Sequence, residues 1–418
     1  MNRHKLKLYF FAALFFAILP ISKSHAVTLD EAVETAKVNS RTIKMEDYKL
    51  KATETLKTEA LGDFLPNVKA SAQYGSRKTN YSASKSGHYE TKELEVEQPL
   101  FSGFKSVSKY KEADYKVRSA TSDNKNKKQE VVLSAITAYC DLFRYREIFK
   151  MQKESKDFAD RFFSLVRRRG DARILDEAEI IKFRYESSNV ETRYFEAANK
   201  LAKAEFEYQN AIGALHGNLI KPTVKDEHFD EKIIIQNALE NNHNLKSSHF
   251  NYLASKAAYN AELSSLSPTV SLVGSVSQQQ NAFYYSGQDY RNKSFYFNIS
   301  VPIFQKGIEY SNISKAGHEK SAAREEFEVV KENLIKELSQ AIEEYNFYRK
   351  LNNANKKLAE LAKNRASILN KRFDAGVEDP IDLMRSKIEL NERKTDLINS
   401  EMDLIIAYHK VKFYLSEI

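Results

Sequence analysis

The chain has 418 residues, of which 29% are charged, and it holds 12 glycines and 7 prolines. This composition is typical of long polar helices and fits poorly with a compact globular enzyme of the same length. The formal net charge is +8, but four basic residues fall within the first 26 residues, so the remainder carries +8 − 4 = +4. That modest charge does not favour a nucleic-acid partner.

Residues 1–26 are predicted to be a secretory signal peptide. Basic residues before residue 8 precede an unbroken apolar run over residues 8–19, and small residues precede the expected cleavage position after Ala26. The apolar run is shorter than the roughly 20 residues that a membrane-spanning helix needs. A short membrane anchor is the alternative interpretation.

Two segments of the first half alternate apolar and polar residues. Residues 68–74 place Val, Ala, Ala and Tyr at every second position, and residues 93–97 repeat the pattern. A period of two with one apolar face predicts strands. The polar, turn-rich stretch between them predicts a β-hairpin over residues 66–104. Pro66 and Pro99 mark the expected changes from helix to strand and back.

Long stretches without glycine or proline predict long helices. Residues 104–169 form one such stretch, and a helix over residues 308–373 would be about 100 Å long. Within residues 183–215 apolar residues recur in steps of four and three, and this 3.5 period predicts helices that pack as left-handed coiled coils. Cys140 lies at helical spacing from apolar neighbours, which predicts a buried thiol.

Three landmarks recur in the same order in both halves: a helix-breaking proline, a second proline within an apolar segment, and a glycine six residues before an aspartate. The first-half copies are Pro66, Pro99, and Gly170 with Asp176; the second-half copies are Pro268, Pro302, and Gly376 with Asp382. The two first prolines are 202 residues apart (268 − 66). Landmarks that recur in one order indicate one structural unit built twice.

The duplication divides the remainder of the chain into residues 27–222 and 223–418. Each unit is predicted to contain a helix, a β-hairpin and long helices that meet at a tip turn. The second hairpin is expected over residues 268–305, and the tip turns near Gly170 and Gly376. Each glycine is placed to end a helix in a left-handed cap.

Each hairpin supplies two strands, so the chain supplies four, and four strands cannot close into a barrel. An open sheet with one apolar face leaves unpaired edges that neither water nor lipid tolerates well. The sequence therefore predicts an α+β membrane protein in which several copies share one transmembrane β-barrel around a watery lumen. The edge of a soluble β-sandwich is the alternative.

The duplicated, exported chain with two strands and long helices per half resembles the TolC family of outer-membrane efflux and secretion channels, the outer membrane factors. The Leu-Pro landmark at Pro66 and the sequence Gln98-Pro99-Leu100-Phe101-Ser102-Gly103 carry the resemblance, which covers about residues 28–416. The resemblance implies a homotrimer with a 12-stranded barrel in the lipid of the bacterial outer membrane. It implies that a long α-helical coiled-coil barrel continues this barrel across the periplasm.

The resemblance also implies a function. Channel-tunnels of this family export drugs or proteins, in multidrug efflux or type I secretion, together with a periplasmic adaptor (membrane fusion) protein and an inner-membrane transporter of the ABC or RND type. No enzyme activity, cofactor or metal is expected, because the sequence has no helical histidine pair, phosphate-binding loop or nucleophile elbow. The alternative is an exported coiled-coil scaffold or adhesin without transport activity.

By the same resemblance, the two tips form a periplasmic gate that rests closed. Asp176 and Asp382 match positions near its constriction, and three copies of Asp382 around a threefold axis would form a ring that selects by charge. The alternative is that both acids only complement the helix dipole in a first turn.

Three tip residues depart from the best-known members. Phe373 stands where an aromatic hydroxyl is expected, Glu378 where they have arginine, and Arg385 where they have aspartate. The first tip is instead rich in arginine, including Arg173, and the second in acid, including Glu378. We hypothesise that opposite charges between the tips hold the gate shut, with solvated turn charges as the alternative.

Overall fold

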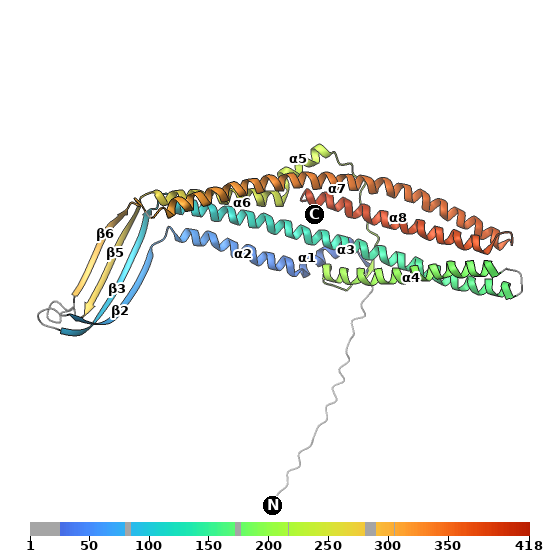
Figure 1. Ribbon diagram of the computed structural model, residues 1–418, viewed down its shortest axis with the longest axis horizontal. Helices are drawn as coiled ribbons and strands as arrows, with labels where there is room; N and C mark the ends of the chain where they lie inside the picture. Colours follow the sequence, from blue (N-terminus) through green and yellow to red (C-terminus); the bar gives the residue numbers. More distant parts are fainter. Residues whose placement is uncertain (1–25, 80–84, 172–176, 216, 281–289, 305) are drawn as a thin grey trace, which may run out of the picture.

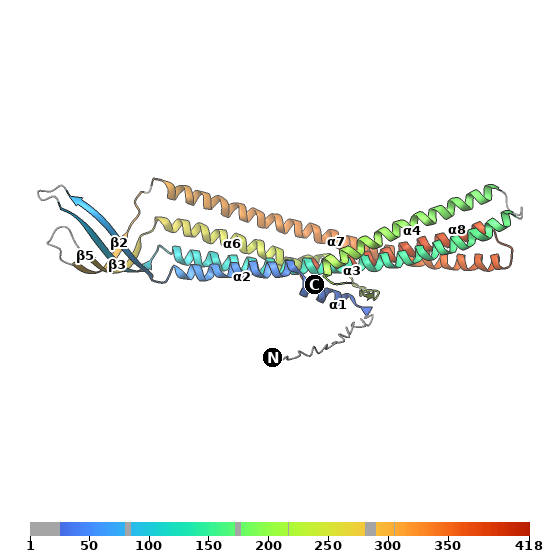
Figure 2. The same ribbon diagram turned by 90° about the horizontal axis from the view of Figure 1, so that it is seen from below.

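The protein forms a long rod with a β-sheet at one end and two helical tips at the other (Figures 1 and 2). The computed structural model describes residues 26–79, 85–171, 177–215, 217–280, 290–304 and 306–418. The predicted signal peptide therefore lies outside the described residues except for Ala26. Among the helices of the described ranges, none has an apolar stretch long enough to cross a membrane.

Six elements of the first half recur in the same order in the second half. The first-half elements are α1 (Leu29–Asn39), α2 (Arg41–Gly62), β2 (Asn67–Thr79), β3 (Lys85–Phe101), α3 (Lys105–Asp171) and α4 (Glu177–Ile212). The second-half elements are α5 (Glu231–Asn241), α6 (His243–Leu263), β5 (Thr269–Gln280), β6 (Tyr290–Ser300), α7 (Ile308–Asp374) and α8 (Pro380–Tyr414). Helices α1 and α5 begin 202 residues apart (231 − 29), and α3 and α7 begin 203 apart (308 − 105), which confirms the predicted duplication.

Three short elements connect these units. Strands β1 (Ala26–Val27) and β4 (Asn218–Leu219) pair in parallel, and the 3-10 helix η1 (Ser264–Leu266) follows α6.

The duplication extends to helix capping, because Ser40 caps α2 and Asn242 caps α6 through side chains that accept a hydrogen bond from a backbone N–H. Such caps satisfy donors that the first helical turn leaves free.

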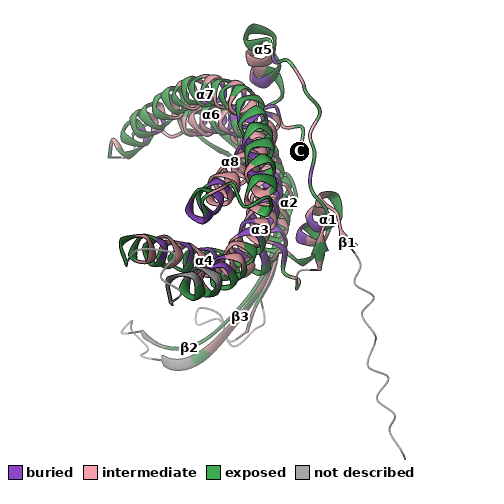
Figure 3. Ribbon diagram, turned by 90° about the vertical axis from the view of Figure 1, so that its right-hand side faces the viewer, coloured by how far each residue is buried: buried purple, intermediate pink, exposed green. Residues whose placement is uncertain are grey.

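The helices form a single curved layer. Helices α3 and α7 have 67 residues each, so they run about 100 Å along the rod. In the half of the rod next to the sheet the order across the layer is α2-α3-α6-α7, and in the half that ends at the tips it is α4-α3-α8-α7. Seen end-on, these helices follow an arc that is open on one side, with α1 and α5 outside it (Figure 3).

The helix seams have the predicted coiled-coil pattern. Phe183, Val190, Ala197 and Ala204 recur every seven residues along α4, and all four are buried. Cys140 of α3 is fully buried, as predicted, and burial raises the pKa of its thiol to about 12. The packing between helices therefore depends on narrow stripes of apolar side chains at a 3.5 period.

The sheet is antiparallel with the strand order β2-β3-β5-β6. Its register places apolar residues on one face in rows across all four strands; one such row is Val68, Val96, Gly274 and Phe295. The neighbouring row, on the opposite face, is Lys69, Glu95, Ser275 and Ser294. Residues directly opposite in an antiparallel sheet share a face, so the predicted alternation gives one apolar face and one mainly polar face, where Val273 and Tyr296 are exceptions.

Three of the four predicted junction prolines flank strands, and one does not. Pro66 and Pro268 directly precede β2 and β5, and Pro302 follows β6. Pro99 lies inside β3, which continues to Phe101, so the prediction that it marks the end of the strand was wrong. The register with β5 shifts between Pro99 and Phe101, and such an irregularity accommodates a residue that has no backbone N–H.

Candidate functional site at the helical tips

The second tip is a tight turn between α7 and α8. Gly376 has φ of 74°, its N–H donates to the carbonyl of Phe373, and the N–H of Val377 donates to the carbonyl of Arg372. These two bonds form a Schellman motif, and the left-handed glycine that the sequence predicts is its central residue. The carboxylate of Asp379 then accepts a hydrogen bond of 2.7 Å from the N–H of Ile381 and caps α8.

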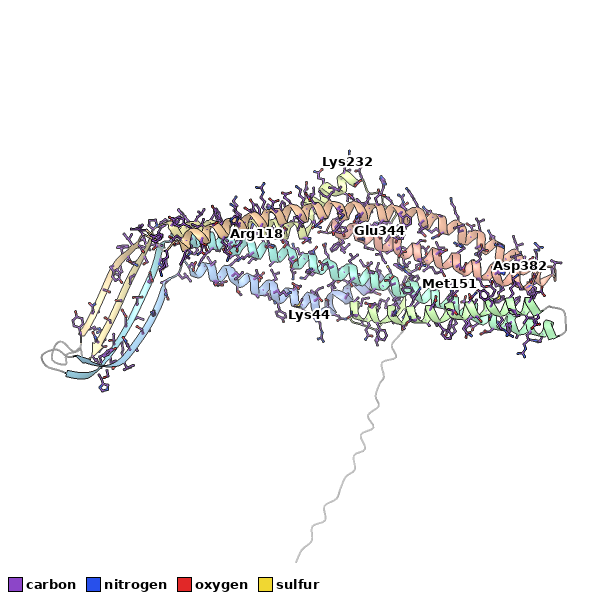
Figure 4. The ribbon with its side chains drawn as sticks, in the orientation of Figure 1. Lys44, Arg118, Met151, Lys232, Glu344 and Asp382 are labelled. Carbon is purple, nitrogen blue, oxygen red and sulfur yellow. The ribbon has the colours of Figure 1, made fainter. Side chains whose placement is uncertain are left out.

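Asp382 is exposed in the first turn of α8, close to the tip end of the rod (Figure 4). The N-terminus of a helix stabilises a carboxylate through the helix dipole. Asp382 is thus one of three exposed aspartates at the second tip, together with Asp374 and Asp379.

Glu378 pairs within its own tip. Its Oε2 lies 3.0 Å from Nε of Arg372, which is an ion-pair distance, but Oε2 has no partner with hydrogen-bond geometry among the described residues. Arg167 and Arg168 are the first-tip arginines whose side chains are described, and both are exposed. Nε of Arg168 donates to the carbonyl of Ser164, in its own helix. Within the described residues, Glu378 is thus not joined to the first tip.

Phe373 packs inward. Its ring centroid lies 5.4 Å from that of Phe162, and both belong to an apolar cluster with Phe183, Leu369 and Ile388. This cluster joins the end of α7 to α3, α4 and α8 just behind the tips. Phe373 therefore contributes apolar packing at the position where the resemblance implies a hydroxyl.

Near the tips, two ion pairs of the described residues join α4 to α8. Nε of Arg385 lies 3.6 Å from Oε1 of Glu186, and Nη1 of Arg193 donates to Oε1 of Glu392 at 2.6 Å. Each pair crosses from α8 to α4. The charges that connect the hairpins therefore lie one or more turns behind the tip loops.

The first tip lies partly outside the described residues. Helix α3 continues through Gly170 to Asp171 and α4 begins at Glu177, so the prediction that Gly170 ends the helix was wrong. The residues that precede Gly170, including Arg167 and Arg168, favour the helix enough to retain a glycine in its last turn. Arg173 and Asp176, two of the predicted gate residues, are outside the described residues.

The edge helices of the tip half carry a second apolar stripe that faces away from the protomer. On α4, Ile181, Tyr185, Phe195 and Phe206 are all more than half exposed. On α7 the exposed residues are Phe347, Leu358, Leu361 and Ile368. The spacings are 4, 10 and 11 residues on α4 and 11, 3 and 7 on α7, which place each set on one face of its helix. Exposed patches of this kind mark interaction surfaces.

The two repeats match one protein family. The sequence profile of the family described as "Outer membrane efflux protein" matches residues 32–215 and again residues 234–416. The chain belongs to the outer membrane efflux protein family. Each match spans one structural repeat, from its first short helix to its hairpin of long helices. The protein is accordingly an outer membrane efflux protein.

Named relatives agree with this family membership. The outer membrane efflux protein BepC of Brucella suis is 22% identical over 327 residues, which is 76% of this chain and 68% of BepC. The solvent efflux pump outer membrane protein SrpC of Pseudomonas putida is 26% identical over 170 residues, which is 40% of this chain and 36% of SrpC. The CmeC outer membrane channel of Campylobacter jejuni has the same fold, with a TM-score of 0.82. The two sequences are 15% identical, and the match covers 93% of this chain and 85% of CmeC.

Two features of the tip region were not predicted from the sequence. The ion pairs of Arg193 and Arg385 join residues more than 190 positions apart, and no sequence pattern identifies such partners. The outward stripes of α4 and α7 do carry a signal, because each helix has a second 3.5-period series beside its buried one. A helix with two such series is expected to pack on two sides.

Proposed function

We propose that three copies of this efflux-family protein assemble into one channel-tunnel. In this assembly, a 12-stranded β-barrel spans the outer membrane and a barrel of helices crosses the periplasm. One observation carries the proposal: the sheet and the layer of helices both end in elements that have a neighbour on one side only. Contacts between copies can satisfy those edges.

The sheet supports the proposal through its unpaired edge strands. Strands β2 and β6 each have one neighbour, so one row of backbone N–H and C=O groups on each strand has no partner strand in the protomer. In a bilayer such groups cost several kcal/mol each when unpaired, so the edge of β6 must meet the edge of a second copy's β2. The apolar face of the sheet can contact lipid, because the side chains of Phe295, Phe297 and Ile299 of β6 are all at least 64% exposed.

The helices support the proposal through their edge stripes. In the tip half the two edges of the layer are α4 and α7, and these are the helices with outward apolar stripes. Packing α4 of one copy against α7 of the next buries both stripes in a coiled-coil seam. The arc of Figure 3 then closes into a ring with its open side toward the central axis.

We further propose that the tips form the gate. Three Asp382 carboxylates would surround the axis at the entrance, and the Arg385–Glu186 and Arg193–Glu392 pairs would hold the α7–α8 hairpin against the α3–α4 hairpin. Such a ring raises the local concentration of cations. Opening requires the two hairpins to separate, so these pairs oppose opening.

The exported cargo proposed here is small molecules, moved with a periplasmic adaptor and an inner-membrane transporter of the ABC or RND type. The support is the efflux description of the family and of SrpC, a solvent efflux pump protein. Secretion of proteins by a type I system would use the same duct, and the cargo that accumulates in a deletion strain distinguishes the two.

Conductance in planar bilayers tests the channel. The purified protein is expected to conduct ions with a preference for cations, and Asp382→Asn should lower the ratio of cation to anion permeability several-fold. Asp374→Asn, which removes an exposed carboxylate at the end of α7, serves as the matched control and should change the ratio less. Absence of conductance from a correctly assembled protein would favour the scaffold alternative. Equal effects of the two variants would refute the role of Asp382.

A further inference from the structure

A cavity of about 520 Å³ lies in the tip half of the rod, where α3, α7 and α8 meet. Its volume is within the range of small-molecule sites, about 300–1,000 Å³. The apolar residues that line it are Phe158, Ala159, Ala366, Met384, Ile388 and Leu390, with Val190 of α4. All of its lining residues come from one protomer, so the cavity does not depend on the proposed trimer.

The charged lining of this cavity is mainly positive. Lys363 and Lys371 of α7 and Lys387 of α8 line it, and Glu154 of α3 is the carboxylate among its lining residues. The formal charge of the lining is therefore +3 − 1 = +2. A cavity with an apolar wall and an excess of ammonium groups is complementary to a molecule with an apolar body and an anionic head.

The three lysines differ from the arginines beside them. Arg365, Arg372 and Arg385 each form an ion pair with a carboxylate. Within the described part of the chain, no carboxylate lies within ion-pair distance of the three lysines that line the cavity. These ammonium groups are thus available for an anion that enters the cavity.

Lys387 is the lysine with the most constrained surroundings. Its Nζ lies 3.9 Å from the centroid of the Phe158 ring, a cation–π contact that holds the ammonium over the apolar wall. Desolvation by burial lowers the pKa of Lys387, and the charge of Arg161 lowers it further, against the opposing effect of Asp374. An anion placed beside this ammonium would replace the water that burial removes.

We propose that this cavity binds a small anionic amphiphile, namely an alkyl carboxylate of medium chain length. The carboxylate pairs with Lys387, and the alkyl chain lies against Phe158, Met384 and Ile388. A ligand in this place touches three helices of both hairpins. It therefore joins the α3–α4 hairpin to the α7–α8 hairpin at the level of the ion pairs described above.

Photo-crosslinking tests the site on the full-length protein reconstituted in nanodiscs. Dodecanoate that carries a diazirine on its chain is bound, irradiated and mapped by peptide mass spectrometry, with unlabelled dodecanoate, dodecanol and dodecylamine as competitors. Crosslinks are expected on peptides of α3, α7 and α8 around Phe158 and Met384, and only dodecanoate should compete strongly. Lys387→Met should weaken binding about tenfold, because it removes one charge-assisted contact while it keeps the apolar stem.

Two further variants make the test specific. Lys357→Met removes an exposed charge of α7 outside the cavity and should leave the affinity within about twofold. Lys387→Arg keeps the charge and should retain binding. Crosslinks confined to the strands, equal competition by dodecanol, or unchanged affinity of Lys387→Met would each overturn the proposal. If Lys387→Met fails to assemble, the wild-type crosslink map decides alone. The conductance test of the channel is independent of every one of these outcomes.

Discussion

Gly376 and Gly62 can be compared to measure the cost of a left-handed backbone without any steric clash of an added side chain. An added Cβ would meet no atom within 4 Å at either position. Gly376 has φ of 74°, whereas Gly62 ends α2 with an ordinary helical backbone. The consequences of Gly→Ala at the two positions therefore depend on the backbone conformation alone.

We expect Gly376→Ala to destabilise the protein by about 1–2 kcal/mol, the cost of the left-handed region for a residue with a Cβ. We expect Gly62→Ala to be neutral or to stabilise by up to about 1 kcal/mol, because alanine loses less entropy in a helix. Urea denaturation followed by circular dichroism measures both. A shift of the two midpoints in the same direction would contradict this explanation of the second tip.

Residue-scale predictions succeeded where the chemistry is local. The left-handed cap at Gly376 needs only neighbouring residues, and the sequence predicted it. The environment of Phe373 could not be predicted in this way, because Phe162 and Phe183, which pack around it, come from other helices. The gate roles of Asp382, Arg385 and Glu378 stay predictions, and those of Arg173 and Asp176 fall outside the described residues.

At the scale of elements, two exposed ion pairs join α4 to α8 beside the apolar packing of α3 against α8. Arg385→Glu combined with Arg193→Glu should replace attraction by repulsion at both places and raise the open probability of single channels. Each exposed pair contributes about 0–1 kcal/mol, so the change in the open-to-closed equilibrium is expected to be several-fold, and smaller at high salt.

The charge-swapped protein is the control for this prediction. Glu186→Arg and Glu392→Arg added to the two arginine variants restore both pairs with reversed polarity, and they should restore the low open probability. Single-channel recording at two salt concentrations provides the measurement. Unchanged opening in the double variant, or no recovery in the swapped protein, would show that the pairs do not hold the hairpins together.

Elements were predictable to different degrees. The long helices and both hairpins follow from periodicity, because an amphipathic period is a property of the chain itself. The continuation of β3 past Pro99 was missed, since the register shift that permits it is set by β5. The helix order α4-α3-α8-α7 was not predictable either, because similar seams at a 3.5 period fit several neighbours.

At the scale of the whole molecule, the protomer is an incomplete layer. Strands β2 and β6 are the open edges of the sheet, and α4 and α7 are the open edges of the helices in the tip half. In the proposed trimer, neighbouring copies cover the apolar stripes of α4 and α7. A charge placed on a stripe should therefore weaken assembly without unfolding the protomer.

Phe195 offers the sharpest test of the helical seam. Its side chain is 59% exposed on α4, and its neighbour Glu196 is exposed on an adjacent face. Phe195→Lys should lower the temperature at which the oligomer dissociates, because a charge would be buried between copies. Glu196→Lys carries the same new charge and should have a much smaller effect. Equal dissociation temperatures would show that α4 does not face another copy.

The central claim is that three copies close each other's edges, and native mass spectrometry of the detergent-solubilised protein tests it most directly. The predicted result is a single assembly with three times the mass of one mature chain. A monomer that is stable without detergent, or an assembly with any other number of copies, would contradict the account.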